Sequence, residues 1–117
     1  MALVLAGDNN FEDLLFLKEF LQASGHELRL ANSCDMVSEL IHAETVEILI
    51  LSLDMLIEEN SFPLLGDIFA QNPRSAVILV TSQPWKESLP IEDLSRYVLL
   101  SRPLDLDKLK EILAQLV

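Results

Sequence analysis

The most constraining feature of this sequence is the regular alternation of strand-length segments with longer segments whose apolar residues recur at helical spacing. The strand-length segments lie at residues 3–6, 27–31, 47–53, 76–80 and 97–100. Between them, apolar residues recur three and four positions apart, which is typical of amphipathic helices. Strands that alternate with helices predict a parallel sheet with helices on both faces, joined by right-handed crossovers.

Individual segments add detail to this α/β prediction. The unbroken apolar run from Ile48 to Leu51 indicates a strand that is covered on both faces. Polar and apolar residues alternate over 27–31, as expected for an edge strand. A first helix is expected at about 11–23, and a second begins after a cap at Asn32 or Ser33. A third is expected from 61–63 to 72, and a last helix from 103 onward. Pro84 and Pro90 interrupt the remaining segment, so a fourth helix within 83–95 is expected to be short or irregular.

Length and charge narrow the class of protein. The 117 residues suit one domain spanning 1–117. Nineteen acidic residues against eight basic ones give a formal charge of −11, which disfavours binding to nucleic acid. No apolar stretch approaches the roughly 20 residues that cross a bilayer. Cys34 is the only cysteine, so an internal disulfide and a cysteine metal cluster are excluded, which favours a cytoplasmic location.

Polar residues follow the predicted strands at the points where these strands end. Asp8 and Asn9 follow the first strand, and Ser52 ends the third with Asp54 close behind. Thr81 and Ser82 follow the fourth strand, and Ser101, Arg102 and Pro103 follow the fifth. Functional groups of open α/β sheets gather beyond the carboxyl ends of the strands. We therefore expect these side chains to converge on one shallow pocket.

Four stretches together resemble the receiver domain of two-component response regulators: residues 3–9, 47–55, 76–82 and 100–103. The resemblance covers essentially the whole chain. It implies a CheY-like, flavodoxin-like three-layer sandwich with strand order 2-1-3-4-5, in a bacterial signalling context. In that family two acids follow the first strand and a phosphoacceptor aspartate ends the third. A threonine or serine ends the fourth strand, and a lysine followed by a cis-proline ends the fifth.

The departures from this pattern predict a degenerate phosphorylation pocket. Ser52 stands at the phosphoacceptor position, where a hydroxyl cannot form an acyl phosphate and is a poor magnesium ligand. Asp8 aligns with the first acid and Asn9 with the second, so one charge is lost. Arg102 replaces the lysine before Pro103, and we expect it to pair with Asp8 and fill the pocket. Neither magnesium nor any other cofactor is therefore expected.

Other positions bear on signalling rather than on chemistry. Thr81 matches the hydroxyl that tracks the phosphoryl group in the family, but without an acceptor we interpret it as a β-branched strand end. Leu99 falls at the family's aromatic switch position, where a leucine cannot swing a ring. Trp85 is a candidate anchor for a protein partner, with packing over the core as the alternative. Leu99 is the second candidate interaction residue.

The sequence thus favours a pseudo-receiver: a phosphorylation-independent signalling domain that acts by contact with a protein partner or by self-association. The chain ends with its last helix, which suits the N-terminal regulatory domain of a longer regulator. A first alternative is an atypical receiver with Asp54 as phosphoacceptor. It requires a third strand two residues longer, since residues two apart on a strand share a face. A second alternative is a small α/β enzyme or ligand-binding domain. It is disfavoured because His26 and His42 fall away from the pocket and no catalytic motif is present.

Overall fold

Five parallel strands form one sheet in the order β2-β1-β3-β4-β5. The computed structural model describes residues 3–82, 97–102 and 104–116. The strands are β1 (Leu3–Gly7), β2 (Glu27–Ala31), β3 (Ile48–Ser52), β4 (Ala76–Thr81) and β5 (Tyr97–Ser101). The described helices are α1 (Phe11–Ala23), α2 (Cys34–Ala43), α3 (Leu53–Glu58), α4 (Pro63–Gln71) and α5 (Leu106–Leu116). The predicted fold class and strand order are confirmed.

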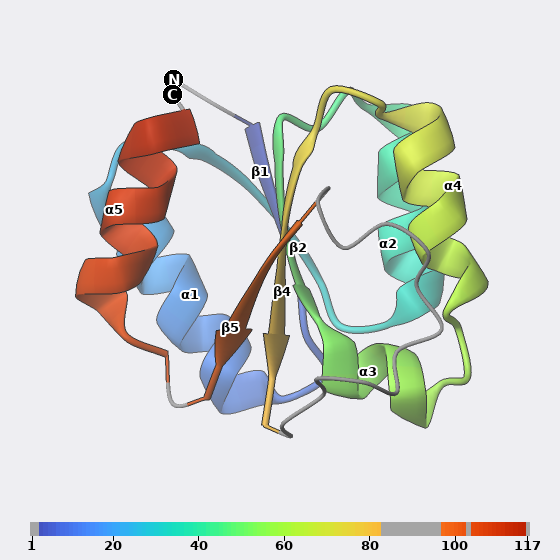
Figure 1. Cartoon of the computed structure of the whole chain (residues 1–117), viewed down its shortest axis with the longest axis horizontal. Helices are drawn as coiled ribbons and strands as arrows, with labels where there is room; N and C mark the ends of the chain where they lie inside the picture. Colours follow the sequence, from blue (N-terminus) through green and yellow to red (C-terminus); the bar gives the residue numbers. More distant parts are fainter. Residues whose placement is uncertain (1–2, 83–96, 103, 117) are drawn as a thin grey trace.

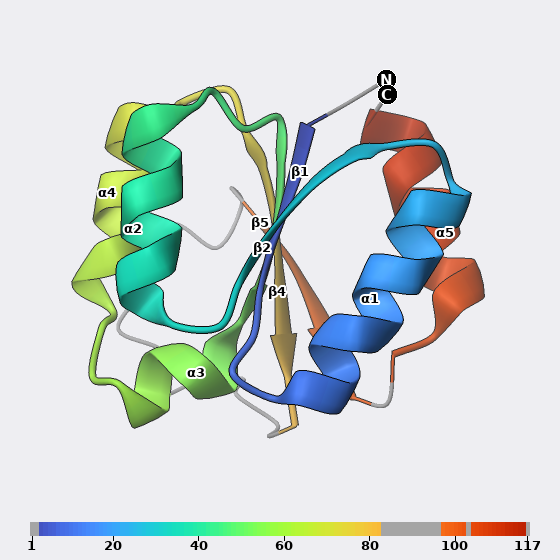
Figure 2. The ribbon, with the colours of Figure 1, turned by 180° about the vertical axis from the view of Figure 1, so that it is seen from behind.

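The helices lie in two layers, one on each face of the sheet. Helices α1 and α5 cover one face, and α2 and α4 cover the other, with α3 at the carboxyl end of the strands (Figures 1 and 2). The predicted short or irregular helix within 83–95 lies outside the described residues. None of the described helices is long and apolar enough to span a bilayer.

Strand β3 is buried on both faces, which explains its unbroken run of apolar residues. Ile48 and Ile50 pack into the core on the α1/α5 side, whereas Leu49 and Leu51 pack into the core on the α2/α4 side. All four side chains are buried. Burial of each such side chain contributes about 1.5–3 kcal/mol, so this central strand fixes both layers to the sheet.

Capping residues set the helix boundaries much as the sequence indicates. The Asn10 side chain accepts a hydrogen bond from the amide of Asp13 at the start of α1. Gly25 follows the end of α1 with a φ of 80°, which is the left-handed conformation expected of a glycine there. Of the two candidate caps for α2, Ser33 is the one used, and its hydroxyl accepts from the amide of Met36.

The segment after β3 differs from the prediction. The third strand was predicted over 47–53, but β3 ends at Ser52, and Leu53 begins α3, a short helix that was not predicted. The Ser52 hydroxyl accepts from the Met55 amide at 3.1 Å and so caps this helix. Leu53, Met55 and Leu56 are buried, which stabilises the helical turn against the core. Asn60 then takes a left-handed φ of 52°, a conformation that asparagine adopts more readily than most residues.

Close packing around Gly7 leads to a first prediction. A Cβ atom added to Gly7 would lie 2.8 Å from Val37 Cγ2 and 3.0 Å from Leu51 Cδ1, both in the buried core. Gly7→Ala is therefore expected to destabilise the fold by about 1–3 kcal/mol, measured as a lower midpoint of urea unfolding. Gly66→Ala is the matched control, because its Cβ would meet nothing within 4 Å and alanine favours a helix by about 0.5–1 kcal/mol. Equal effects of both substitutions would contradict the packing argument.

Candidate functional site

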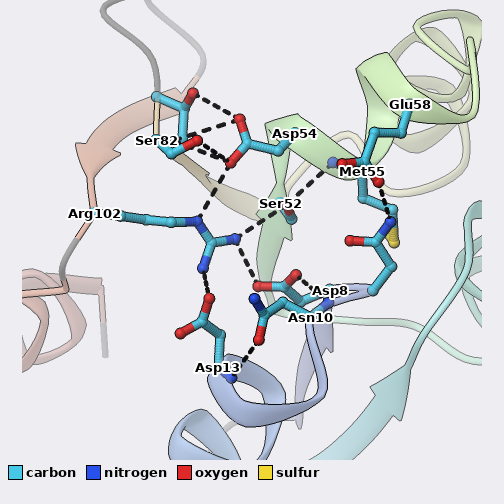
Figure 3. A network of polar contacts seen from close by, with 11 residues as sticks. Asp8, Asn10, Asp13, Ser52, Asp54, Met55, Glu58, Ser82 and Arg102 are labelled. Carbon is cyan, nitrogen blue, oxygen red and sulfur yellow. Dashed lines mark hydrogen bonds and ion pairs between the residues drawn. The ribbon is translucent and has the colours of Figure 1, made fainter.

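Side chains from four strand ends converge at the carboxyl edge of the sheet (Figure 3). Asp8 follows β1, Ser52 ends β3, Thr81 ends β4 and Arg102 follows β5. The backbone extends the parallel pairing by one residue, since the Arg102 amide donates to the Thr81 carbonyl at 2.8 Å. The predicted convergence is thus confirmed for these four residues. We call the group formed by Asp8, Asp13, Ser52, Asp54, Thr81, Ser82 and Arg102 the Arg102 cluster.

The guanidinium of Arg102 is the centre of this cluster. Its Nη2 donates to Asp8 Oδ2 at 2.7 Å and to Ser52 Oγ at 3.2 Å. Its Nη1 donates to a carboxylate oxygen of Asp13, and its Nε lies 3.4 Å from Asp54 Oδ2. The predicted pairing of Arg102 with Asp8 is confirmed, and one cation is shared among three carboxylates.

Asp8 is the most deeply buried carboxylate of the cluster, with 3 % of its surface exposed. Both of its oxygens are used, because Oδ1 accepts from the Asn10 amide at 2.9 Å and Oδ2 accepts from Arg102. A buried carboxylate requires such compensation, since an unpaired buried charge costs several kcal/mol. Burial of the Arg102 guanidinium opposes its charge, but the hydrogen bond and charge of Asp8, with the charges of Asp13 and Asp54, outweigh it and raise the pKa of Arg102.

The side chain of Asn9 points away from the Arg102 cluster and binds Glu58. Its Nδ2 donates to Glu58 Oε2 at 2.6 Å, across to the end of α3. The side chain at the family's second acidic position therefore ties the loop after β1 to α3. This corrects the expectation that Asn9 would converge on the pocket with Asp8.

Asp54 reaches the cluster from a helix and not from a strand. The argument that placed it on a longer third strand is wrong, because β3 ends two residues earlier and Asp54 lies in the first turn of α3. Its Oδ1 accepts from Thr81 Oγ1 at 3.1 Å. Its Oδ2 accepts from the Ser82 amide at 3.0 Å and from Ser82 Oγ at 2.9 Å. Thr81 thus has a polar role here, beyond that of a β-branched strand end.

One residue of the cluster was not singled out from the sequence. Asp13 lies in the first turn of α1, and its carboxylate faces Arg102, which is 89 residues later in the chain. Ser82 was expected at the pocket as a polar residue after β4, and its amide and hydroxyl both donate to Asp54. The signal for Asp13 was its position close to Asp8 at a helix start, whereas the direction of its side chain could not be read from the sequence.

The remaining predicted residues are Trp85, Pro103, Leu99 and the two histidines. Trp85 and Pro103 lie outside the described residues. Leu99, on β5, is 39 % exposed, which leaves it available for contact with a partner. His26 follows α1 and His42 lies in α2, so neither histidine is at the carboxyl edge, as expected. Burial raises the pKa of the Cys34 thiol to about 11, so this cysteine stays protonated and unreactive at neutral pH.

Comparisons with solved structures identify the architecture. A signal receiver domain of an HD domain-containing protein from Pseudomonas fluorescens Pf-5 is 24 % identical, with a TM-score of 0.79 over 97 % of this chain and 92 % of that one. A response regulator receiver domain protein from Clostridium thermocellum is 18 % identical, with a TM-score of 0.84 over 99 % and 94 %. Vibrio cholerae CheY4 is 18 % identical, with a TM-score of 0.79 over 100 % and 99 %. The chain has the receiver fold. No family model and no curated protein matches the sequence.

A receiver pocket implies a magnesium ion, and the residues present here do not fit one. The carboxylate of Asp8 is engaged on both oxygens, and the hydroxyl of Ser52 accepts from Met55 and Arg102. Within the described ranges, no three His, Cys, Asp or Glu side chains are grouped so as to hold a metal ion. A divalent cation about 4 Å from the guanidinium would be repelled by about 8 kcal/mol at an effective dielectric constant of about 20. That repulsion would offset the attraction of one carboxylate at the same distance.

Two of the cavities in the described part of the structure lie near opposite ends of the sheet. One of about 330 Å³ adjoins the cluster and is lined by Glu12, Asp13, Phe16, Arg102 and Leu104. The other, of about 480 Å³, is lined by residues 45–48 and 71–76, at the amino ends of β3 and β4. The second cavity is therefore at the edge of the sheet opposite the Arg102 cluster.

Proposed function

We propose that this domain is a receiver-like signalling module that acts by contact with a protein partner, or by self-association, without phosphoryl transfer. The observation that carries the proposal is the Arg102 guanidinium bound to Asp8 and Ser52 at the strand ends. The fold supports a signalling role, because the similar structures include response regulator receiver domains. Because these structures are only 18 % identical to this chain, they show its fold, and the signalling role is our inference.

Three features of the pocket argue against phosphoryl transfer. The third strand ends in a hydroxyl, Ser52, which cannot form an acyl phosphate. The remaining acid, Asp8, is committed to Arg102 and to the Asn10 amide. The arginine brings a positive charge to the place where a cation would have to bind. From these groups we infer that the domain is not phosphorylated, binds no magnesium cofactor and catalyses no reaction.

The partner is inferred to be a protein. Repulsion between a chain of net charge −11 and phosphate backbones argues against nucleic acid. Exposed apolar side chains offer contact area: Phe11 is 76 % exposed on α1, and Val98 and Leu99 are 40 % and 39 % exposed on β5. Trp85 remains a predicted anchor. We further propose a cytoplasmic single domain within a bacterial regulator, on the grounds of its lone cysteine and its receiver fold.

A second candidate function keeps phosphorylation and makes Asp54 the acceptor. The observation in its favour is that the Asp54 carboxylate lies at the carboxyl edge, next to Thr81 and Arg102. Against it, hydrogen bonds from the Thr81 hydroxyl and from the Ser82 amide and hydroxyl hold both oxygens of this carboxylate. One experiment separates the two candidates.

The protein is incubated with magnesium and acetyl phosphate, and separately with beryllofluoride. We expect no phosphoryl adduct by intact-mass spectrometry and no localised change in amide chemical shifts around Asp8, Ser52 and Asp54. The reason is the absence of a free carboxylate and of a cation site in the cluster. Asp54→Asn is the matched variant. Stoichiometric phosphorylation of the wild type that disappears in Asp54→Asn would establish the second candidate and refute the first.

A further inference from the structure

We propose that the cavity at the amino ends of β3 and β4 binds an aliphatic α-amino acid as its zwitterion, with Arg74 receiving the carboxylate and Glu47 the ammonium group. The cavity has a volume of about 480 Å³ and is lined by residues 45–48 and 71–76. Volumes of about 300–1,000 Å³ are typical of small-molecule sites. The inference goes beyond the proposed function and does not depend on it, because this cavity lies at the edge of the sheet opposite the Arg102 cluster.

Two loops form the walls of this cavity, and hydrogen bonds between them fix their positions. The loop from α2 to β3 and the loop from α4 to β4 lie side by side at the amino edge of the sheet (Figures 1 and 2). The Asn72 side chain is buried, and its Oδ1 accepts from the Val46 amide at 3.2 Å. The Ser75 hydroxyl donates to the Val46 carbonyl. The walls of the cavity are therefore formed before any ligand binds.

The local sequence explains where the two charged residues lie. Residues 72–75 form a turn, closed by a hydrogen bond of 3.0 Å from the amide of the last residue to the carbonyl of the first. Proline in second position favours such a turn, which places Arg74 at the wall of the cavity. Glu47 directly precedes β3, and its carbonyl accepts from the Ala76 amide at 3.0 Å. Both charged residues thus project from backbone that is held by hydrogen bonds.

Arg74 and Glu47 are exposed, and neither forms an ion pair within the described ranges of the chain. The other two arginines in those ranges, Arg29 and Arg102, both bind carboxylates. Two opposite charges therefore line one cavity, and their charged groups are too far apart to bind each other. A ligand that carries both charges can bind both groups at once.

An α-amino acid is the small molecule that fits this arrangement. Its carboxylate can accept two parallel hydrogen bonds from the planar guanidinium of Arg74, and its ammonium group can donate to Glu47. A plain carboxylate would be repelled by Glu47, and a plain amine would be repelled by Arg74. Pro73, which is exposed, and Ala76, which is half-buried, add apolar surface. No aromatic side chain is among the described residues that line the cavity, which favours an aliphatic ligand.

The test is a titration of the full chain with L-leucine, followed by NMR. We expect saturable shifts of amide resonances within 45–48 and 71–76, and none around Asp8, Ser52 and Arg102. Two analogues of leucine each lack one charge: isocaproate has no ammonium group and isoamylamine has no carboxylate. Each analogue is expected to bind about tenfold more weakly than leucine, which corresponds to the loss of one charge-assisted hydrogen bond.

Two variants assign the charges to their residues. Arg74→Gln should lose the preference for leucine over isoamylamine, and Glu47→Gln should lose the preference for leucine over isocaproate. Both side chains are exposed, so the fold is expected to tolerate these changes. Lys108→Gln is the matched control, because it removes an exposed cation near the start of α5 and should leave leucine binding unchanged.

Three results would each overturn the proposal: no saturable shift with leucine, equal affinity of the wild type for leucine and both analogues, or unchanged preferences in Arg74→Gln and Glu47→Gln. The incubation with acetyl phosphate reports on the opposite edge of the sheet. Failure of the amino-acid site is therefore distinguishable from failure of the proposed function.

Discussion

Arg102→Met is expected to lower the free energy of unfolding by about 3–5 kcal/mol, the cost of leaving a buried charge without its partner. Asp8 is 3 % exposed and would keep only the Asn10 amide as a donor. Ser52 and Asp13 would also lose the guanidinium that they contact. Methionine retains the length of the aliphatic stem, so the effect reports mainly on charge. Urea unfolding followed by circular dichroism measures it.

The double variant Asp8→Asn/Arg102→Met tests the cause of that loss. It removes both charges and keeps an acceptor for the Asn10 amide, so we expect it to recover most of the lost stability. Arg29→Met is the matched control on the surface, because Arg29 binds Glu44 with two hydrogen bonds of 2.8 Å. That pair is more exposed than the pair of Arg102 and Asp8, and its loss is expected to have a much smaller effect. Equal losses for Arg29→Met and Arg102→Met would show that burial of Asp8 is not the cause.

The fold was predictable because each strand carries its own burial signal. The run Ile48–Leu51 alternates between the two core clusters, which no strand with a solvent-facing side could do. Each polar strand end was predictable for a related reason, since parallel strands bring their carboxyl ends to one edge. The pairing of Arg102 with Asp8 followed from charge: a buried acid with few neighbouring donors needs a cation, and one is available after β5.

What the sequence could not give was the direction of side chains after the strands end. Leu53 is apolar like the residues of β3, so strand and helix are both compatible with it until Ser52 is seen to cap α3. Because Asp54 lies in a helical turn and not on the strand, its side chain does not follow the alternation of β3. Asp13 and Arg102 are 89 residues apart, and they meet because α1 begins at the edge of the sheet where β5 ends (Figure 3). Asn9 was assigned to the pocket by its position in the family pattern, but its side-chain amide donates to Glu58 instead.

Restoring the family pattern should produce a large gain of function. The variant Asn9→Asp/Ser52→Asp/Arg102→Lys is expected to bind magnesium at least about 100-fold more tightly than the wild type, and to accept a phosphoryl group from acetyl phosphate. Two added carboxylates each contribute a few kcal/mol of Coulomb attraction to a divalent cation at an effective dielectric constant of about 20. Titration by NMR measures the metal affinity, and intact-mass spectrometry measures the adduct. Adding Asp54→Ala should increase the extent of phosphorylation, because the Asp54 carboxylate otherwise occupies the donors of Thr81 and Ser82.

The contribution of each restored residue can be separated. Asn9→Asp/Arg102→Lys keeps Ser52 and should bind magnesium weakly without any acyl phosphate, because no acceptor carboxylate ends β3. Asn9→Asp/Ser52→Asp keeps Arg102, whose planar guanidinium reaches Asp8 and the end of β3 at the same time. If the guanidinium excludes the cation, this second variant stays unresponsive to magnesium in spite of its three carboxylates. Tight magnesium binding by Asn9→Asp/Ser52→Asp would show instead that the arginine does not exclude the cation.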